Sequence, residues 1–442
     1  MSLGTAMFTG ISGISTFGNA MNVIGDNIAN VNTIGFKGSS SQFGALLSTT
    51  MTTSGANSIQ VGHGVYLAGV QTNFTQGSFQ STGSSTDMAI QGNGFFVVRD
   101  PSVGTNFYTR AGSFTQDLNG NLVNTLGDIV QGFNQITKTG AVSDVNVISM
   151  QSSPPKVSTN FTLGANLDST AQPITGGAAA LATALAATPP NPPTPTYSTT
   201  FDLFDAQGNR VTMTANFWNT GVPGTVTAPG VNTDWAYQLV PPTGDAITGG
   251  TGTLEFDGSG TLVGVNSTAA LNTTNPTLAI TPPGANPSPI NITWNAFDNA
   301  GHPTITSYAA SSGTISLTQD GYTSGALKGL QVNTSGVLSG VYTNGQTVPL
   351  YQLQLANFAD PFGLNRISGT LYSQTATSGQ PINGLANSGG LGSIQGNTLE
   401  LSNVDLATEF VNMVQTQEGY QANSKIITTS DSMTQTILGI IR

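Results

Sequence analysis

The sequence predicts a mixed, mainly β protein in which paired terminal α-helices, packed in the manner of a coiled coil, flank antiparallel β-domains inserted between them. Three observations support this fold class. Both ends of the chain carry apolar residues at helical spacing, a glycine turn signature recurs between them, and short strand-like segments flank these turns. With 442 residues, the chain is long enough to bury a substantial core.

The first element is a helix that we expect to begin near Leu3 and to end around Asn30 to Asn32, where asparagines and then Gly35 provide stop signals. Its apolar residues recur at spacings of three, four and seven, which is a heptad pattern. The predicted stripe consists of Met7, Ile11, Ile14, Met21 and Ile28, with Gly18 and Gly25 at intervening positions.

A second heptad stripe predicts a C-terminal helix over 404–441, about 57 Å long at 1.5 Å per residue. Ser402 and Asp405 form a start signal similar to a capping box. The stripe consists of Leu406, Phe410, Met413, Tyr420, Ile427, Leu438 and Ile441. A helix of this length with one narrow stripe needs a partner, which the other terminus supplies. Two ordinary amphipathic helices packed on a globular core are the alternative.

Between the helices, Asp or Asn is repeatedly followed three residues later by Gly, which predicts hairpin loops with glycine in the left-handed conformation. The flanking segments are short and strand-like, so the middle of the chain is expected to be antiparallel β. The signature occurs at Asp117–Gly120, Asp205–Gly208, Asp257–Gly260 and Asn333–Gly336.

We expect four structural parts, one of which contains an exposed loop. The glycine-containing stretch 33–70 is expected to be an extended arm, and an Ala- and Pro-rich stretch near 175–195 is expected to be an exposed loop. The other parts are a terminal helical domain of 1–32 and 401–442, an inner β-domain of 71–145 and 330–400, and an inserted outer β-domain of 146–329.

The composition excludes several classes of function. Only 7% of residues are charged, against about 25% in a typical soluble domain, and the net charge of −11 gives no attraction for nucleic acid. The absence of cysteine excludes disulfides and thiolate chemistry. No run of about 18 apolar residues predicts membrane insertion. A secretory signal peptide is not apparent either, which leaves export without a cleaved signal open.

No residue pattern predicts catalysis, a cofactor or a metal site. The turn at Asp117 resembles the opening of a calcium loop but lacks the usual Glu at its end, so a hairpin turn is the better interpretation. His63 and His302 are isolated in the sequence. A glycosidase pair such as Asp202 and Asp205 is better explained by turn and strand-end roles. We therefore expect a protein that is not an enzyme.

Three segments resemble the flagellar rod and hook axial proteins, in the order that this family has them. Asp26–Lys37 resembles the signature near the N-terminal helix, Gly94–Phe114 a β-core segment, and Leu399–Asn423 the C-terminal signature. Phe201–Asn209 and Gly340–Gln346 resemble hook subunits in particular. The signature residues are Asn27, Asn30, Gly35, Phe36, Ser402, Asn403, Val404 and Asp405.

The resemblance implies a structural subunit that polymerises into the flexible tube of the hook, which joins rod to filament and transmits motor torque as a universal joint. It implies contacts with the distal rod protein, the hook cap and the hook–filament junction proteins, and extracellular assembly after export by the flagellar type III apparatus. Phe43 and Leu47 are similar to a short export-gate motif, although a core strand or an arm contact explains them equally well. A distal rod protein and a secreted β-rich adhesin or carbohydrate-active enzyme are the alternatives.

Overall fold

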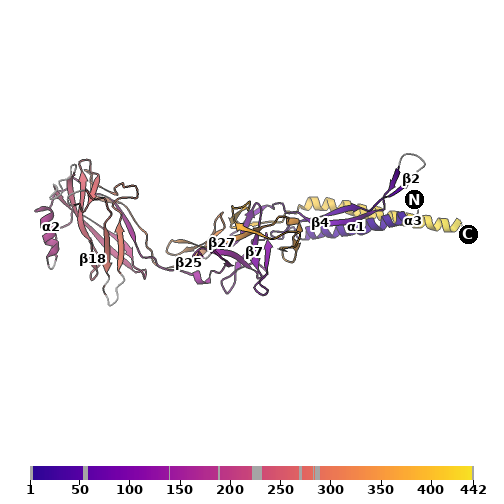
Figure 1. Cartoon of the computed structure of the whole chain (residues 1–442), viewed down its shortest axis with the longest axis horizontal. Coiled ribbons are helices and arrows are strands. Elements are labelled where there is room, and N and C mark those ends of the chain that lie inside the picture. The colour runs from indigo at the N-terminus through magenta and orange to yellow at the C-terminus, as the bar shows by residue number, and fades with distance from the viewer. Residues whose placement is uncertain are drawn as a thin grey trace. The chain divides into compact units, whose positions relative to one another are not determined.

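The computed structural model describes residues 3–52, 58–138, 140–187, 190–221, 231–267, 271–281, 283 and 289–440. The chain divides into two compact units (Figure 1). Unit 1 consists of Met1–Gln151, Leu327–Tyr342 and Thr347–Arg442, and unit 2 of Ser152–Ala326 and Thr343–Gln346.

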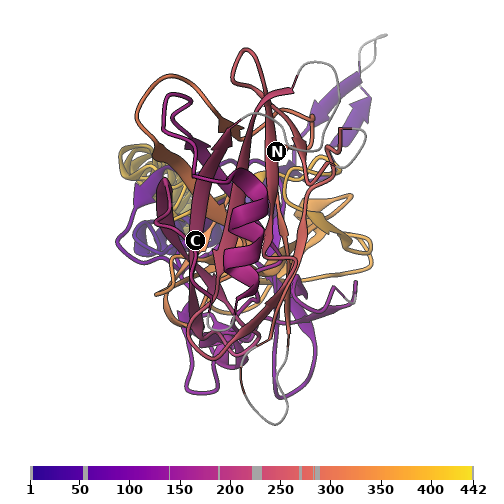
Figure 2. The same ribbon diagram turned by 90° about the vertical axis from the view of Figure 1, so that its left-hand side faces the viewer.

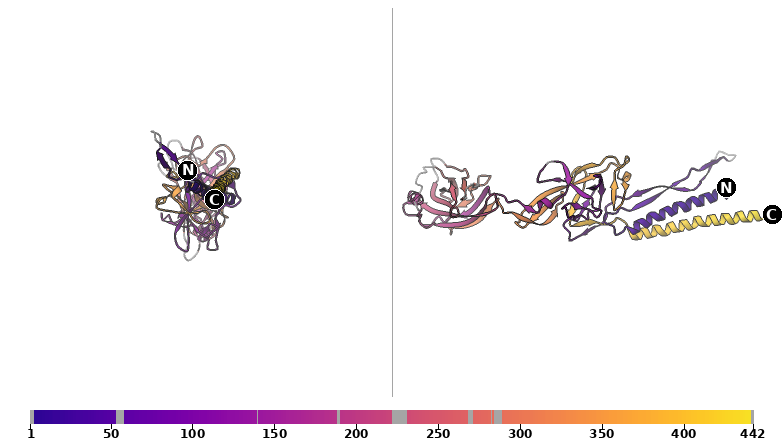
Figure 3. Two further views of the ribbon diagram at one scale, coloured as in Figure 1. Left: turned by 90° about the vertical axis from the view of Figure 1, so that its right-hand side faces the viewer. Right: turned by 90° about the horizontal axis from the view of Figure 1, so that it is seen from below.

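Unit 1 holds both terminal helices, α1 (Leu3–Ala29) and α3 (Leu406–Ile440), which lie side by side in Figure 3. Helix α1 ends where the Asn30 side chain donates a hydrogen bond to the carbonyl of Asp26 (2.9 Å). Helix α3 begins where the Asp405 carboxylate accepts the Thr408 N–H (3.0 Å), which is an N-cap. The predicted pair of terminal helices is confirmed.

The segment expected to be an extended arm is a two-stranded ribbon. Strand β1 (Ser39–Ala45) pairs antiparallel with β4 (Val65–Thr72), and β2 (Thr49–Thr52) pairs with β3 (Ser58–Val61). The ribbon packs on α1, since Ser12 Oγ accepts the Val65 N–H (3.3 Å).

The β-domain of unit 1 contains an antiparallel sheet with the order β25-β26-β27-β11-β7-β8-β29-β28. Its core includes Phe96, Phe114 and Leu353. Strand β25 (Gly325–Val332) begins with two residues of unit 2. Besides the helices, the ribbon and β25, unit 1 consists of β5 (Phe79–Ser81), β6 (Met88–Gln91), β7 (Phe95–Arg99), β8 (Asn106–Thr109), β9 (Thr115–Gln116), β10 (Leu122–Val123), β11 (Ile129–Asn134), β12 (Val142–Asp144), η1 (Ile148–Met150), β26 (Val337–Tyr342), β27 (Thr347–Asn357), η2 (Pro361–Gly363), β28 (Asn365–Arg366), β29 (Leu371–Ser373), β30 (Ile382–Leu385), β31 (Ser393–Gly396) and β32 (Thr398–Glu400).

Unit 2 packs two sheets around an aromatic core in which Phe161 stacks on Phe201 and Trp294. One sheet has the order β15-β16-β17-β19-β20. The other has the order β18-β21-β22-β14-β23, with β24 also paired to β14. Its pairings are antiparallel except that β14 runs parallel to β22 and β23. The strands are β13 (Ser152–Ser153), β14 (Asn160–Asn166), β15 (Tyr197–Phe204), β16 (Arg210–Gly221), β17 (Val231–Val240), β18 (Ala246–Thr248), β19 (Thr251–Asp257), β20 (Leu262–Val265), β21 (Thr277–Thr281), β22 (Ile290–Trp294), β23 (Ile305–Thr306) and β24 (Gly313–Gln319).

The division between the units falls inside the range 146–329 expected for the outer domain. Val147 and Met150 are buried in the core of unit 1, and Leu330 packs there as well. Apolar side chains on either side of the Ser152–Ala326 segment therefore belong to the unit 1 core.

The four predicted glycine turns are confirmed. In each, the side chain of the first residue accepts backbone N–H groups of the turn, and the glycine has a positive φ between 73° and 84°. They connect β9 to β10, β15 to β16, β19 to β20 and β25 to β26. Asp298–Gly301 forms a further turn of this kind that the sequence analysis missed.

The Ala- and Pro-rich stretch near 175–195 is not simply an exposed loop, and this expectation was wrong. It contains helix α2 (Gly177–Ala186), which lies in front of the strands of unit 2 in Figure 2. Leu181 is buried against Trp218 and Ala236. Alanine has the highest helix propensity, and the prolines follow only after the helix has ended. Pro189 of this stretch lies outside the described residues.

Replacing Leu181 with Asp should therefore destabilise unit 2 by about 3 kcal/mol or more, because a charge would be buried where an apolar side chain now packs. Thermal unfolding followed by tryptophan fluorescence measures the effect, since Trp218 lies under the helix. Ala182→Asp adds the same charge to the exposed side of α2 and serves as the control. Equal stability of the two variants would contradict the packing role.

Candidate functional site: the terminal helices and their anchor

The two terminal helices approach closely through glycines. A methyl group added at Gly10 would lie 2.9 Å from Ile427 Cγ1, and one added at Gly13 would lie 2.4 Å from Asn423 Oδ1. At the third contact, a methyl group on Gly419 would lie 2.7 Å from the Phe17 ring. Residue numbers rise along α1 as they fall along α3, so the helices are antiparallel. We call this line of contacts the helix seam.

The buried line of α1 differs from the predicted stripe. Small residues dominate it, because they let the two backbones approach closely. Its members are Gly10, Gly13, Thr16, Ala20, Ile24 and Asn27. The predicted stripe lies beside this line: Met7, Ile14, Met21 and Ile28 are only partly buried, and Ile11 is 51% exposed.

Helix α3 shows the same difference. Of the predicted stripe, Met413 and Ile427 are partly covered. Leu406, Phe410, Tyr420 and Leu438 are exposed, with 49% exposure at Phe410 and 62% at Leu438. Ile441 lies outside the described residues. Large apolar side chains of both helices are thus left open within a single copy of the chain.

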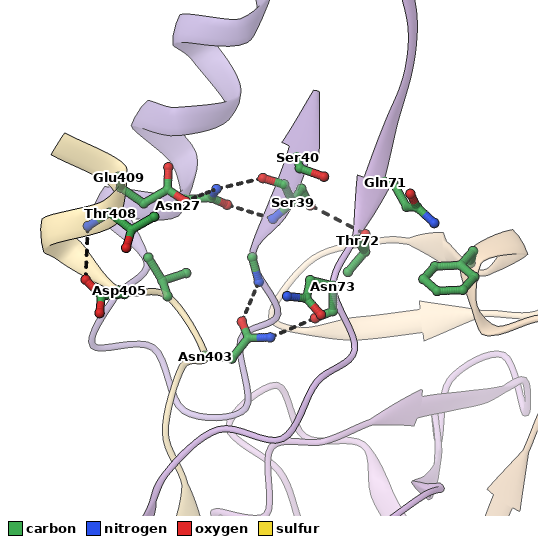
Figure 4. Close-up of a pocket in the computed structure, with 13 residues that line it drawn as sticks. Asn27, Ser39, Ser40, Gln71, Thr72, Asn73, Asn403, Asp405, Thr408 and Glu409 are labelled. Atoms are coloured by element: carbon green, nitrogen blue, oxygen red, sulfur yellow. Dashed lines mark hydrogen bonds between the residues drawn. The ribbon is translucent and has the colours of Figure 1, made fainter. Parts of the chain in front are cut away.

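The helix pair is tied to the base of the ribbon by two asparagines of the signature segments (Figure 4). Asn27 Nδ2 donates to the Ser39 carbonyl (2.7 Å), while its Oδ1 accepts the Ser39 N–H (2.9 Å). The same Nδ2 also reaches Glu409 Oε1 (3.2 Å). Asn27 therefore connects α1, the ribbon and α3. Burial raises the pKa of Glu409 above its usual value, and the hydrogen bond from Asn27 opposes this shift.

Asn403 makes the equivalent connection before α3. Its Oδ1 accepts the Gly38 N–H (2.9 Å), and its Nδ2 donates to the Asn73 carbonyl (2.8 Å), so it joins both strands at the base of the ribbon (Figure 4). Val404 packs against the same segment, since a methyl group on Gly38 would lie 3.0 Å from Val404 Cγ2. Ser402 Oγ accepts the Val404 N–H (3.3 Å).

The N-terminal signature also fixes the chain against the β-domain. Gly35 has a φ of 68°, and a methyl group there would lie 2.5 Å from the Ala111 backbone nitrogen. This position therefore requires glycine both for its conformation and for the close approach. The neighbouring Phe36 is buried, and the Arg366 guanidinium lies 4.4 Å above its ring.

Beneath these contacts lies a buried ionic group that we call the anchor cluster: Lys37, Arg110 and Glu400. The Lys37 and Glu400 side chains are fully buried and form an ion pair, and Arg110 Nη1 lies 3.5 Å from Glu400 Oε2. Lys37 Nζ also donates to the Thr75 carbonyl (2.8 Å), and Glu400 Oε1 accepts the Gly77 N–H (2.9 Å). Burial lowers the pKa of Lys37, against the opposing effect of Glu400.

Lys37, Arg110 and Glu400 lie in the three segments that resemble the axial family, but no local pattern predicted that their charges meet. The scarcity of charge could have indicated the cluster, because the chain has only 31 Lys, Arg, Asp and Glu side chains. Three of them occur in separate signature segments, each beside apolar residues. Two buried cations share one carboxylate, so removing Glu400 leaves both without their anionic partner.

The two residues of the suggested export motif lie on the ribbon side of the helices. Phe43 in β1 is half exposed, and its ring centroid lies 5.5 Å from that of Phe17 in α1. Leu47 is 92% exposed. Phe43 therefore contacts α1 from the arm, whereas most of the Leu47 side chain is open among the described residues.

Within the described part of the chain, no group of three or more His, Asp or Glu side chains is placed to hold a metal ion. None of the helices in that part of the chain is both long enough and apolar enough to cross a membrane.

Four family descriptions match successive parts of the chain. They are flagella basal body rod protein (7–37), flagellar hook protein FlgE/F/G D1 domain (89–164), flagellar basal body protein FlaE D2 domain (166–322) and flagellar basal body rod FlgEFG protein C-terminal (395–440). These matches, with the terminal helices and inserted β-domains, define an axial protein of the bacterial flagellum.

Full-length relatives specify the family further. The flagellar hook protein FlgE of Treponema pallidum is 34% identical, over 99% of this chain and 99% of that protein. The flagellar hook protein FlgE of Escherichia coli is 32% identical, over 97% and 98% of the two chains. A crystal structure of Helicobacter pylori FlgE2 aligns with a TM-score of 0.49 at 16% identity, covering 73% of this chain and all of that one. The chain belongs to the flagellar hook protein FlgE family.

Proposed function

We propose that this chain is the structural subunit of the flagellar hook, that it polymerises into a flexible helical tube joining rod to filament, and that it catalyses nothing. One observation carries the proposal beyond the family membership. The glycine-rich seam satisfies one side of each terminal helix, while large apolar residues such as Phe410 and Leu438 stay open. Exposed apolar side chains along a helix favour contacts with further copies of the chain.

We also infer where the subunit's parts lie in the tube and how the subunit is exported. The terminal helices line the tube's channel, and the outer domain forms polar contacts that slide as the tube bends. The low charge content of 7% supports weak, hydrated contacts there. The subunit leaves the cell through the flagellar type III apparatus without a cleaved signal, with Phe43 and Leu47 as the gate motif. It meets the distal rod protein, the hook cap and the hook–filament junction proteins outside.

A distal rod protein is the second candidate, because two of the matching family descriptions name rod proteins. The match over 166–322, which covers nearly all of unit 2, favours the hook. A secreted adhesin would retain binding after removal of both terminal helices, whereas a hook subunit would lose polymerisation. Truncation therefore separates these classes.

Phe410→Asp tests the proposal. It should abolish tube formation by the purified chain, because a charge would replace an apolar contact worth about 2 kcal/mol or more at each interface. Electron microscopy detects the tubes, and circular dichroism checks that the β-domains stay folded. Phe410→Leu keeps an apolar side chain at this position and should still assemble. Normal tubes from Phe410→Asp would show that this residue faces solvent in the polymer.

A further inference from the structure

Unit 2 contains a cavity of about 270 Å³ at the turn between β19 and β20. The segment that follows β23 forms another wall, and the two are joined where the Ser307 N–H donates to the Gly260 carbonyl (2.8 Å). Pockets for drug-sized ligands have volumes of about 300–1,000 Å³, so this cavity suits a smaller molecule. Its lining includes Thr233, Phe256, Asp257, Ser259, Ser307 and Tyr308.

Ser307 brings a buried hydroxyl group to the cavity. The residue is 3% exposed, and its Oγ has no hydrogen-bond partner among the described residues. Burying a hydroxyl group without a partner is unfavourable, and native proteins contain few such groups. Because Ser307 lines the cavity, a molecule bound there can supply the missing hydrogen bond.

Asp257 brings an open carboxylate oxygen. Its Oδ1 accepts the N–H groups of Ser259 and Thr261 (both 2.9 Å), as expected for this turn. In the three other turns of this kind that begin with Asp, Oδ2 bonds to the side chain four residues later (2.9–3.0 Å). That position here is Thr261, whose hydroxyl lies 3.0 Å from Ser259 Oγ instead. No side chain in the described part of the chain donates to Asp257 Oδ2, which is therefore open to a ligand.

Tyr308 adds an aromatic face to the same wall. It is 51% exposed. Its position is fixed, since its N–H donates to Asn166 Oδ1 (2.9 Å) and a methyl group on Gly260 would lie 2.9 Å from its Cδ1. The face of an aromatic ring is apolar and carries partial negative charge. It therefore suits the C–H groups of a ring-shaped ligand.

We propose that this cavity binds a single neutral sugar ring, whose hydroxyl groups bond to Asp257 Oδ2 and Ser307 Oγ and whose C–H face packs on Tyr308. The lining contains one carboxylate and no Lys or Arg, which disfavours an anionic ligand. Ca²⁺ takes six to eight oxygen ligands, commonly from several carboxylates, and the lining provides only one. This binding goes beyond the proposed structural function and does not depend on it.

Saturation-transfer NMR on the full chain tests the proposal with glucose, galactose, mannose and N-acetylglucosamine as probes. We expect transfer to the ring C–H protons of at least one of them. Asp257→Asn should weaken this binding about tenfold or more, because an NH₂ group replaces the accepting Oδ2. Asparagine preserves the turn, as Asn333 does in its own turn. Asp298→Asn makes the same change in a turn that does not line the cavity and should leave binding unchanged.

The other two side chains give independent measurements. Tyr308→Ala should abolish the transfer, whereas Tyr308→Phe keeps the ring and should retain it. Ser307→Ala should weaken binding about tenfold without lowering the unfolding midpoint of unit 2, since its hydroxyl has no partner within the described protein.

Absence of transfer to all four sugars would overturn the proposal, and so would equal binding by Asp257→Asn and the wild-type chain. Binding of Ca²⁺ alone, detected by calorimetry and lost in Asp257→Asn, would identify a cation site and overturn it as well. Tube formation is a separate measurement, so a failure of sugar binding is distinguishable from a failure of the proposed function.

Discussion

Replacing Glu400 with alanine should lower the free energy of unfolding of unit 1 by about 3–5 kcal/mol, because both buried cations of the anchor cluster lose their carboxylate. Lys37 is fully buried and Arg110 nearly so, which keeps water from taking the place of the missing charge. Removing Lys37 as well, by Lys37→Met in the Glu400→Ala background, should recover part of the loss.

The two units provide an internal control for this measurement. The three tryptophans, Trp218, Trp235 and Trp294, all lie in unit 2. Their fluorescence should therefore report an unchanged unfolding midpoint, while hydrogen exchange in β7 and β27 of unit 1 becomes faster. Glu418→Ala makes the same chemical change at an exposed position. If Glu400→Ala and Glu418→Ala alter exchange equally, the cluster contributes nothing specific.

Gly13→Val should raise the critical concentration for tube formation, since even the first carbon of the new side chain would lie 2.4 Å from Asn423 Oδ1 and would displace the Asn423 side chain. Forcing extra atoms into a packed contact costs about 1–3 kcal/mol, and each copy in the polymer carries this cost. Gly25→Val is the matched control, because no atom lies within 4 Å of a methyl group at Gly25.

The two valine variants also test which glycine of α1 lies in the helix seam. The heptad pattern places Gly25 in the contact, whereas the structure places Gly13 there. Gly25→Val should be neutral or slightly stabilising for α1, because valine has a higher helix propensity than glycine. Critical concentrations for tube formation compare the two. Impaired assembly of Gly25→Val with normal assembly of Gly13→Val would reverse the assignment.

The sequence predicted the elements whose cause is local. Both terminal helices follow from the spacing of apolar residues. The observed bounds of α1, Leu3–Ala29, agree with the predicted bounds to within a few residues. The hairpin turns follow from an Asp or Asn and a glycine within four positions. Helix α2 was not predicted, because the prolines that follow it are typical of a loop. The alanines that form it have a high helix propensity.

The seam and the anchor cluster depend on residues far apart in the sequence, and local patterns did not reveal them. Heptad reasoning assigns large apolar residues to a contact, so it selected Ile11 and Phe410. The actual contact is made where side chains are smallest, at Gly10, Gly13 and Gly419. The pairing of Lys37 with Glu400 joins positions 363 residues apart.

The distance in sequence between Lys37 and Glu400 also determines when a newly synthesised chain can assemble. A nascent chain that has not yet been translated through Glu400 contains Lys37 without its partner and α1 without α3. No earlier segment can complete unit 1, because β32 and α3 follow its other described elements in the sequence. Contacts between such distant segments form only after a large loop has closed, and they form slowly. Ribosome-bound intermediates that lack α3 therefore lack the self-associating surface, and premature aggregation through it is delayed until α3 has been synthesised.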